Sequence, residues 1–372
     1  MFLINAKIIN DDFQLVEADL KIEENRIADI GEKLSYQETD MVIDCKGYIL
    51  APGFVDIHIH GCAGADTCDG TREAIETMAE FLLSKGITSF CPTTMTLDKE
   101  SVKKSVEAVR TCMENPCKGA AIVGINMEGP FIAEGRKGAH KAEYIIKPSL
   151  EWFEEIQKAS GNAIKLVSVA PEQDEEGFIE KVKDSCVVSI AHTVTNFDGA
   201  KASFDRGVCH ATHLFNAMPG LSHREPGVVG AILDDERVTG ELICDGYHVH
   251  PAVLKMAFKV LGDRAIIISD SMRANGLEEG EVSDLGGQVV TVSGGRATLE
   301  DGTLAGSVSN LHEEVKNLVS YGVPLTQAVK SASYLPAKRI GLEKEIGSIA
   351  VGKKADIVVL DEELNIAAVY HE

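Results

Sequence analysis

Two histidines, His58 and His60, lie two positions apart in the apolar run 53–60, and Asp56 stands two positions before them. In a β-strand, residues two apart point to the same face, so the two imidazoles would project in parallel from bases about 7 Å apart and could reach one metal ion. Such a pair is frequent by chance, and the alternative is two histidines that face solvent or are satisfied by hydrogen bonds. The pair alone therefore leaves metal binding open.

Four more polar residues each end a later apolar run: Glu128, His192, His213 and Asp270. In a parallel barrel the carboxyl ends of all strands open on the same rim, so these side chains would meet there. Imidazole nitrogen and carboxylate oxygen suit Zn²⁺, Fe²⁺ and Mn²⁺ alike, and a catalytic site of this kind keeps one coordination position for water. The spacing therefore predicts a divalent-metal centre without naming the metal.

Such a centre favours hydrolysis, because the ion lowers the pKa of bound water towards ~7 and polarises a carbonyl oxygen. Asp270 ends the last of the apolar runs, where it could take the proton of that water and return it to a leaving amine. The alternative for Asp270 is a helix N-cap, since Ser269-Asp270-Ser271 after a strand is also a capping sequence.

The elements that must position these residues alternate in type. Amphipathic stretches such as 71–86 and 98–113, with apolar residues at helical spacing, separate most of the apolar runs of strand length. Those runs are 53–60, 86–92, 120–128, 164–171, 186–192, 207–213, 238–245 and 264–270. Eight strands with helices between them predict an α/β fold, a (β/α)8 TIM-like barrel over residues 52–340.

Both ends of the chain are β-like and differ from the middle. Residues 2–49 and 347–361 contain short β-branched runs separated by turn dipeptides. We therefore predict a small β-sandwich domain built from both chain termini, residues 1–51 and 341–372, with the barrel inserted between them. The hairpin-like segment 283–300 is an alternative contributor to that small domain.

The composition narrows the function classes. The 372 residues carry a net charge of −22, which argues against nucleic acid and against an anionic membrane as partners. An anionic substrate would then need a few local cations to hold it. Nine cysteines, an odd number without a Cys-x-x-Cys pair, indicate reduced thiols and a cytoplasmic protein. No apolar run reaches the roughly 18 residues that a membrane span requires.

The motifs around these residues resemble the amidohydrolase superfamily and, within it, the N-acetylglucosamine-6-phosphate deacetylase family. The matching segments follow the family's order over essentially the whole chain. They are APGFVDIHIHG (51–61), INMEGPFI (125–132), KGAH (137–140), IAHT (190–193), THLFNAM (212–218), REPG (224–227), DGYHV (245–249), SDSMRANG (269–276) and GTLAGS (302–307).

The resemblance implies a divalent metal cofactor, Zn, Fe or Mn, with one or two ions per subunit. Glu128, His192 and His213 would bind the principal ion, and His58 and His60 would hold a second one with Glu128 as the bridge. Some family members replace the first-strand histidines by amides and work with one metal. This sequence keeps both histidines, so the second ion stays an open expectation.

The resemblance also implies roles at the substrate. Asp270 matches the family's catalytic acid/base, and His140 would donate a hydrogen bond to the acetamide oxygen, although without the resemblance it would be interpreted as a loop histidine. The remaining substrate contacts would come from Ala139, Asn216, Ala217, Arg224, His248, Leu304 and Ala305. The Arg224 guanidinium is suited to bind a phosphate, and its alternative is a surface salt bridge. His248 would contact the substrate within one subunit or across a dimer interface. Other histidines, among them His210, have no matched role.

The implied activity is removal of the N-acetyl group of N-acetylglucosamine 6-phosphate, in amino-sugar catabolism, by a cytoplasmic homodimer. One alternative is another N-acyl sugar phosphate as substrate, such as N-acetylgalactosamine 6-phosphate. A second is a non-catalytic scaffold of the same fold. A scaffold would be expected to have lost at least one of the metal ligands or Asp270, whereas all are present.

Overall fold

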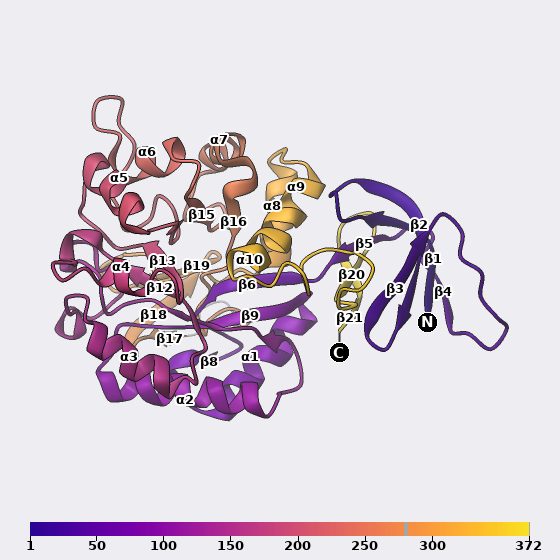
Figure 1. The fold of residues 1–372 in the computed structure, drawn as a ribbon, viewed down its shortest axis with the longest axis horizontal. Coiled ribbons are helices and arrows are strands. Elements are labelled where there is room, and N and C mark those ends of the chain that lie inside the picture. The colour runs from indigo at the N-terminus through magenta and orange to yellow at the C-terminus, as the bar shows by residue number, and fades with distance from the viewer. Residues whose placement is uncertain (279–281, 372) are drawn as a thin grey trace.

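The structure is a computed structural model that describes residues 1–278 and 282–371. It contains a parallel barrel, a sheet made from both chain ends and a small three-stranded sheet beside the barrel (Figure 1). The first and last segments of the chain lie side by side, away from the barrel, and the helices surround the barrel strands (Figure 1).

The barrel strands coincide with the eight apolar runs of the sequence. They are β6 (Phe54–Ile59), β9 (Ile87–Thr94), β10 (Ala121–Ile122) with β11 (Ile125–Met127), β12 (Ile164–Val169), β13 (Val187–Ile190), β14 (His210–Ala211), β15 (Thr239–Leu242) and β16 (Ala265–Ile267). All pair in parallel, and the Asp270 N–H donates to the His58 carbonyl at 2.9 Å, which brings the end of the eighth strand to the first. The prediction of a (β/α)8 barrel is confirmed.

The helices lie outside the strands and begin where the sequence supplies caps. Thr71 and Asp98 accept hydrogen bonds from the backbone of the first turns of α1 and α2, as N-caps do. The α-helices are α1 (Arg72–Ser84), α2 (Lys99–Glu114), α3 (Leu150–Ala159), α4 (Phe178–Val182), α5 (Phe197–Arg206), α6 (Gly227–Asp234), α7 (Pro251–Leu261), α8 (Leu311–Ser320), α9 (Leu325–Ala332) and α10 (Tyr334–Arg339). None of the described helices combines the length and the apolar character needed to cross a membrane.

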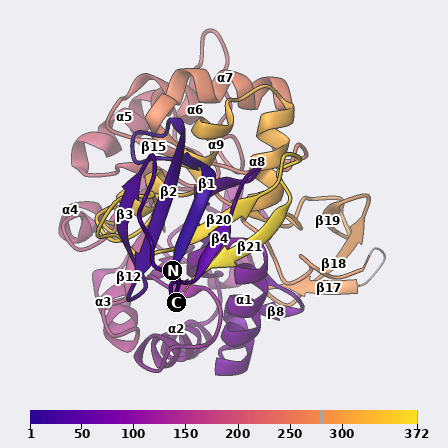
Figure 2. The same ribbon diagram turned by 90° about the vertical axis from the view of Figure 1, so that its right-hand side faces the viewer.

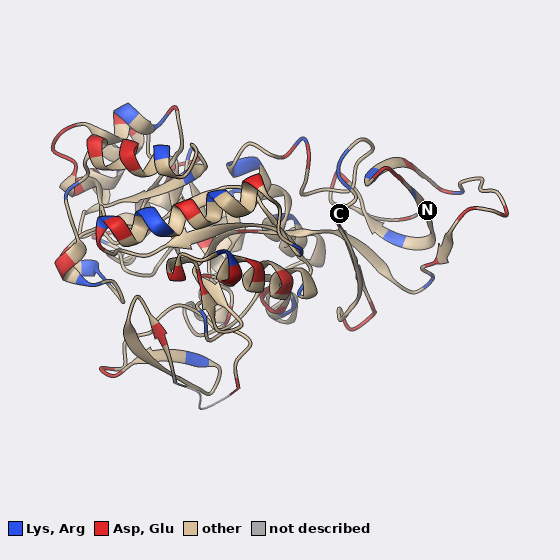
Figure 3. Ribbon diagram, turned by 90° about the horizontal axis from the view of Figure 1, so that it is seen from below, with Lys and Arg blue, Asp and Glu red and all other residues tan. Residues whose placement is uncertain are grey.

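Short elements complete the rim of the barrel. The strands β7 (Gly61–Cys62) and β8 (Ala65–Asp66) form a small hairpin directly after β6. The 3₁₀ helices span Thr67–Asp69, Glu134–Arg136, Ala142–Tyr144, Pro171–Gln173 and Gly262–Arg264. Acidic and basic positions are interspersed along the outer helices on the side seen in Figure 3.

The two chain ends form one hydrogen-bonded sheet (Figure 2). Its strands are β1 (Phe2–Ile9), β2 (Leu15–Glu23), β3 (Arg26–Gly31), β4 (Val42–Asp44), β5 (Ile49–Pro52), β20 (Ile357–Leu360) and β21 (Ile366–Tyr370). Antiparallel pairing of β5 with β20 joins the first part of the chain to the last. The sheet has its own apolar cluster, which includes Leu3, Leu20 and Ile349.

We propose on this basis that the terminal segments form one domain and the barrel another. Ile346 packs with barrel residues such as Ile57, whereas Ile349 packs in the cluster of the terminal sheet. The second boundary would therefore lie near residue 347, slightly after the expected residue 341.

The segment 283–300 belongs to neither unit. It forms the antiparallel sheet β17 (Val282–Leu285), β18 (Gln288–Ser293) and β19 (Arg296–Leu299), which stands apart from the terminal sheet in Figures 2 and 3. Val290 and Ala297 pack against Met95 and Met272 at the barrel rim. Because its apolar face is buried against the barrel, we propose that this hairpin belongs with the barrel and not with the terminal domain.

Candidate active site

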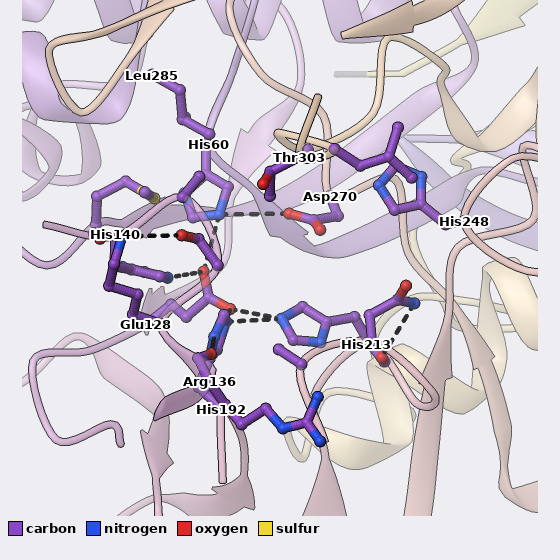
Figure 4. Close-up of a pocket in the computed structure, with 18 of the residues that line it drawn as sticks. His60, Glu128, Arg136, His140, His192, His213, His248, Asp270, Leu285 and Thr303 are labelled. Atoms are coloured by element: carbon purple, nitrogen blue, oxygen red, sulfur yellow. Dashed lines mark hydrogen bonds and ion pairs between the residues drawn. The ribbon is translucent and has the colours of Figure 1, made fainter. Parts of the chain in front are cut away.

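A cavity of about 640 Å³ opens at the carboxyl ends of the barrel strands (Figure 4). Most residues singled out in the sequence line it: His60, Glu128, Ala139, His140, His192, His213, Asn216, Ala217, His248, Asp270 and Leu304. His58 is fully buried next to His60, and Ala305 is buried beside Leu304. Arg224 is exposed and does not line this cavity.

Three of the lining residues follow their strands with an unusual backbone conformation. His192, His213 and Asp270 have φ values of 43°, 29° and 46°, in a region that residues with a Cβ rarely adopt. Each comes just after a barrel strand, so the backbone leaves the ladder at the residue whose side chain faces the cavity. Backbone strain of this kind is concentrated at functional sites.

The carboxylate of Glu128 lies between two groups of histidines. Its Oε1 atom is 3.2 Å from His192 Nε2 and 3.0 Å from His213 Nε2. Its Oε2 atom is 3.0 Å from His60 Nε2 and 3.5 Å from His58 Nε2. Glu128 therefore directs one carboxylate oxygen at each group of histidines.

Hydrogen bonds on the far side of the rings orient three of these histidines, whereas His213 Nδ1 has no partner among the described residues. The Nδ1 atom of His58 is 2.9 Å from Glu241 Oε2, and that of His192 is 2.7 Å from the Arg136 carbonyl. The Nδ1 atom of His60 likewise faces a backbone carbonyl, at 3.3 Å. In the neutral form of these three rings the Nδ1 atom carries the proton, because it faces an acceptor, and the Nε2 lone pair points into the site.

The donor set fits a divalent ion. His58 Nε2 is buried and has no hydrogen-bond partner among the described residues, although two carboxylates surround it. Such an atom is costly to bury unless a cation or a donor satisfies it. Neutral imidazoles with a carboxylate suit Zn²⁺, Fe²⁺ and Mn²⁺. His58, His60 and Glu128 bring their ligand atoms close enough together to hold one ion.

His140 faces the same centre, and its tautomer decides what it can do. Glu128, His140 and His192 also bring possible ligand atoms together. The Thr96 N–H, however, donates to His140 Nδ1 at 3.2 Å, so the neutral ring carries its proton on Nε2. Burial lowers the pKa of His140 to about 4, which keeps the ring neutral. His140 therefore presents an N–H to the centre, which suits a hydrogen-bond donor and not a metal ligand.

Asp270 is held in its ionised form. Burial by itself would raise the pKa of its carboxyl group, but the charge of His58 and a hydrogen bond from His60, when these rings are protonated, hold that pKa below its usual range. A divalent ion held in place of those protons would act on Asp270 in the same direction. The Oδ1 atom of Asp270 lies 3.4 Å from His60 Nε2. The chain after Asp270 forms a turn and no helix begins there within residues 271–278, so the N-cap alternative does not apply. Asp270 is thus an accessible proton acceptor.

The substrate side of the cavity is built by loops. Asn216 and Ala217 lie in a turn after His213, held by an N–H···O bond of 2.9 Å from Asn216 to the His213 carbonyl. His248 is fixed by Asp245, whose Oδ2 atom lies 2.7 Å from His248 Nδ1. The side chain of Gln288 in β18 donates to the Ala139 carbonyl, so the three-stranded sheet contacts the cavity wall.

Several residues that line or support the site were not identified in the sequence, among them Glu241, Asp245 and Arg136. Glu241 lies in the middle of the apolar run 238–245, and an acid inside a predicted barrel strand is a signal that its side chain needs buried partners. Asp245 ends the same run. Arg136 lines the cavity with its side chain and binds His192 through its backbone carbonyl, but nothing in the sequence distinguishes it from other loop cations.

Comparisons with known proteins find similarity along most of the chain. The amidohydrolase family model matches residues 49–371. The N-acetylglucosamine-6-phosphate deacetylase of Bacillus subtilis (strain 168) is 39% identical over 329 residues, which cover 86% of this chain and 82% of that protein. The N-acetylgalactosamine-6-phosphate deacetylase of Escherichia coli O157:H7 is 32% identical over 87% of this chain and 86% of its own length.

A solved structure agrees in fold as well. The crystal structure of N-acetylglucosamine-6-phosphate deacetylase from Pasteurella multocida superposes with a TM-score of 0.92 at 31% identity, over 100% of this chain and 97% of that one. With the barrel and the convergent histidines, these similarities show that this chain belongs to the amidohydrolase family, in the group of the N-acetylglucosamine-6-phosphate deacetylases.

Proposed function

We propose that this protein hydrolyses the N-acetyl group of N-acetylglucosamine 6-phosphate, giving glucosamine 6-phosphate and acetate in amino-sugar catabolism. The observation that carries the proposal is the convergence of Glu128, His192, His213, Asp270 and His140 on one cavity. A scaffold without activity would not need a neutral donor, an ionised acceptor and a set of metal ligands in one place. The similarity to deacetylases of this name supports the same assignment.

The residues present would hold one or two divalent ions. We place the principal ion at Glu128, His192 and His213, and a second at His58 and His60 with Glu128 as the bridge. When bound, a divalent ion would lower the pKa of water in the site and polarise the amide carbonyl. Zn²⁺, Fe²⁺ and Mn²⁺ are the candidates, because imidazole and carboxylate ligands suit all three.

Two side chains would carry the proton and the charge. Asp270 takes a proton from the attacking water as its oxygen bonds to the acetyl carbon, and then gives that proton to the amine nitrogen when the C–N bond breaks. His140 donates its Nε2–H to the amide oxygen, on which negative charge develops. The low pKa of His140, about 4, means that this donor is a neutral imidazole at pH 7.

The phosphate of the substrate needs cations within reach. Arg136 and Lys137 line the cavity, and Lys137 Nζ lies 3.3 Å from the His140 carbonyl, so part of its hydrogen bonding is used by its own loop. We propose that Arg136 and the Asn216-Ala217 turn bind the phosphate. Arg224 lies outside the cavity of its own chain, so its expected role would be exerted on a neighbouring copy in the homodimer that we also propose.

A second candidate is deacetylation of N-acetylgalactosamine 6-phosphate, which is favoured by the similarity to the Escherichia coli protein of that name. The two substrates differ in the orientation of one hydroxyl, whereas the metal centre, Asp270 and His140 act on the acetamide. The same site could therefore serve either sugar. From its number of cysteines without a Cys-x-x-Cys pair, we infer a cytoplasmic enzyme.

The test is acetate release by metal-loaded protein from both sugar phosphates, with the ratio of kcat/KM between them as the readout. We expect the glucosamine epimer to be preferred and Asp270→Asn to remove most of the activity. A preference for the galactosamine epimer would select the second candidate. No acetate from either sugar, together with less than one bound ion per chain, would favour the non-catalytic scaffold.

A further inference from the structure

Glu241 is a charged residue enclosed in the barrel. It lies on β15 with no exposed surface, and it does not line the cavity. A buried carboxylate is strongly destabilising unless donors surround it. Neighbouring histidines supply such donors, since Glu241 accepts hydrogen bonds from two imidazole rings and from one backbone N–H.

Each oxygen of this carboxylate has its own partners. Oε2 accepts from His58 Nδ1 at 2.9 Å and from the backbone N–H of His213 at 3.1 Å. Oε1 lies 2.9 Å from His210 Nε2. Glu241 thus connects the first, sixth and seventh strands of the barrel below the metal centre, and two of its three contacts are with predicted metal ligands.

His210 holds the carboxylate from the other side. Its Nδ1 atom is 2.6 Å from the Thr239 hydroxyl, which can donate to it, so Nε2 carries the proton that Glu241 accepts. His210 had no role in the sequence analysis. In the structure it completes a chain of hydrogen bonds from Thr239 through His210 and Glu241 to His58.

This chain of hydrogen bonds fixes the orientation of the His58 ring. Its Nδ1 proton is committed to Glu241, so its Nε2 lone pair must face the site, 3.5 Å from Glu128 Oε2 and 3.5 Å from Asp270 Oδ1. A flipped ring would instead present an N–H to the ion. A carboxylate behind a ligating histidine both orients the ring and increases the basicity of the ligating nitrogen.

We propose that Glu241 is a positioning residue for the second metal site, and that it sets the affinity of the His58 and His60 position for its ion. It touches neither the substrate nor the cavity and acts through His58. This inference rests on the proposed metal centre but not on the identity of the substrate. Its contact with the principal site is limited to the His213 backbone, so the effect on the principal ion should be smaller.

The experiment is a titration of metal-stripped full-length protein with Co²⁺, followed by calorimetry and by the visible absorption of the bound ion. In Glu241→Gln the amide oxygen can still accept from His58. The amide NH₂ group would then face His210 Nε2, which accepts a hydrogen bond once the His210 proton moves to Nδ1. The variant thus removes mainly the charge. We expect two Co²⁺ sites in the wild type, and a 10- to 100-fold weaker second site with a changed spectrum in the variant.

Glu314→Gln is the matched control. Glu314 is also fully buried, but its carboxylate accepts from Ser309 Oγ at 2.6 Å and from the Cys244 N–H at 2.8 Å. Neither partner is a predicted metal ligand. This variant should therefore keep both Co²⁺ affinities. Thr239→Val removes the hydroxyl that faces His210 Nδ1 and leaves Glu241 in place. It should weaken the second Co²⁺ site to a smaller degree than Glu241→Gln. This variant tests the proposal if Glu241→Gln does not fold.

Three results would overturn the proposal. One is a Glu241→Gln protein, or a Thr239→Val protein if only that one folds, that binds two ions with wild-type affinity and spectrum. Another is an equal loss of both sites in Glu241→Gln and Glu314→Gln, which would indicate a general effect of replacing a buried carboxyl group by an amide. The third is a wild-type protein that binds a single ion. Because the titration contains no sugar, a failure of the proposed deacetylation would leave its outcome intact.

Discussion

The Nε2 atoms of His192 and His213 lie 3.0 Å apart, although the residues end different strands and are separated by 21 positions. Both atoms also face the same oxygen of Glu128. Two imidazole nitrogens this close repel each other unless a proton or a cation lies between them. Their approach is the most direct sign that this part of the site is built for a positive charge.

His213→Gln should therefore reduce metal binding at the principal position. We expect the bound divalent ion, measured by elemental analysis after dialysis, to fall by about one per chain. Because an ion that binds only the folded state stabilises it, added metal should raise the unfolding temperature of the wild type more than that of the variant. Equal metal content in the two proteins would contradict this assignment.

Asp270→Asn should lower kcat by about 10²- to 10⁴-fold, the usual range for loss of a general acid–base group. The amide keeps the size of the side chain but cannot accept the proton of water. Asp301→Asn is a suitable control. Asp301 also lines the cavity, but it lies on the loop after β19 and does not end a barrel strand. If the two variants lost kcat to the same extent, Asp270 would not be the proton acceptor.

Arg136→Gln should raise KM for the sugar phosphate by about 10- to 100-fold, since hydrogen bonds to charged groups contribute about 1.5–3 kcal/mol. The substitution leaves the backbone carbonyl that binds His192, so kcat should change little. Unphosphorylated N-acetylglucosamine provides the comparison, because its kcat/KM should be the same for wild type and variant. An unchanged KM for the phosphate would place the anion elsewhere.

Arg224→Gln tests the homodimer as well as the phosphate site. If Arg224 acts on a neighbouring copy, the variant should raise KM at protein concentrations at which the wild type is dimeric. Mixing it with Asp270→Asn protein should then restore part of the activity in mixed dimers, because one of their two cavities would contain both Asp270 and a neighbouring Arg224. No recovery on mixing, with dimers demonstrated by light scattering, would argue against this arrangement.

Asp235 should contribute to stability in a pH-dependent way. The Arg237 guanidinium and the Lys201 ammonium hold the pKa of its carboxyl group well below the usual range. A lowered pKa in the folded state stabilises the protein above the unfolded value of about 3.9, and that contribution is lost as the pH falls towards the folded value. Asp235→Asn should therefore cost about 1–3 kcal/mol at pH 7 and less below pH 4.

Urea unfolding at several pH values measures this difference. Asp263→Asn provides the control, since Asp263 pairs with Lys330 at 2.7 Å but its side chain is 75% exposed. An exposed pair of this kind contributes at most about 1 kcal/mol. A loss in Asp235→Asn that stayed constant from pH 7 to pH 3 would show that the effect is not due to the carboxylate charge.

The sequence predicted the barrel well because its signal is repetitive. Each strand needed only a short apolar run, and the residues that end those runs, such as Glu128 and Asp270, meet on one rim as a consequence of the fold. The boundary between the terminal sheet and the barrel, and the packing of segment 283–300, were harder to predict from the sequence. An antiparallel hairpin has the same pattern whether it packs on a sheet or on a barrel rim, and only tertiary contacts such as those of Met95 decide it.

Within the site, the sequence did not predict the residues that hydrogen-bond to the proposed metal ligands and orient them. Glu241 and His210 lie on strands in the barrel interior, and their partners come from strands far away in the chain. No local spacing relates His58 to Glu241, which are 183 positions apart. Arg136 was missed for a different reason, because its role depends on which way a loop turns. Local motifs therefore identify ligands better than the hydrogen bonds that orient them.

The left-handed backbone at His192, His213 and Asp270 also bears on how this protein can be engineered. Glycine adopts this conformation without the cost of roughly 1–3 kcal/mol that a residue with a Cβ carries. A library selected only for heat resistance, without metal ions, is therefore expected to accumulate glycine at these positions. Its members would keep the barrel and lose the chemistry, so selections for thermal tolerance and for turnover would diverge at the same three strand ends.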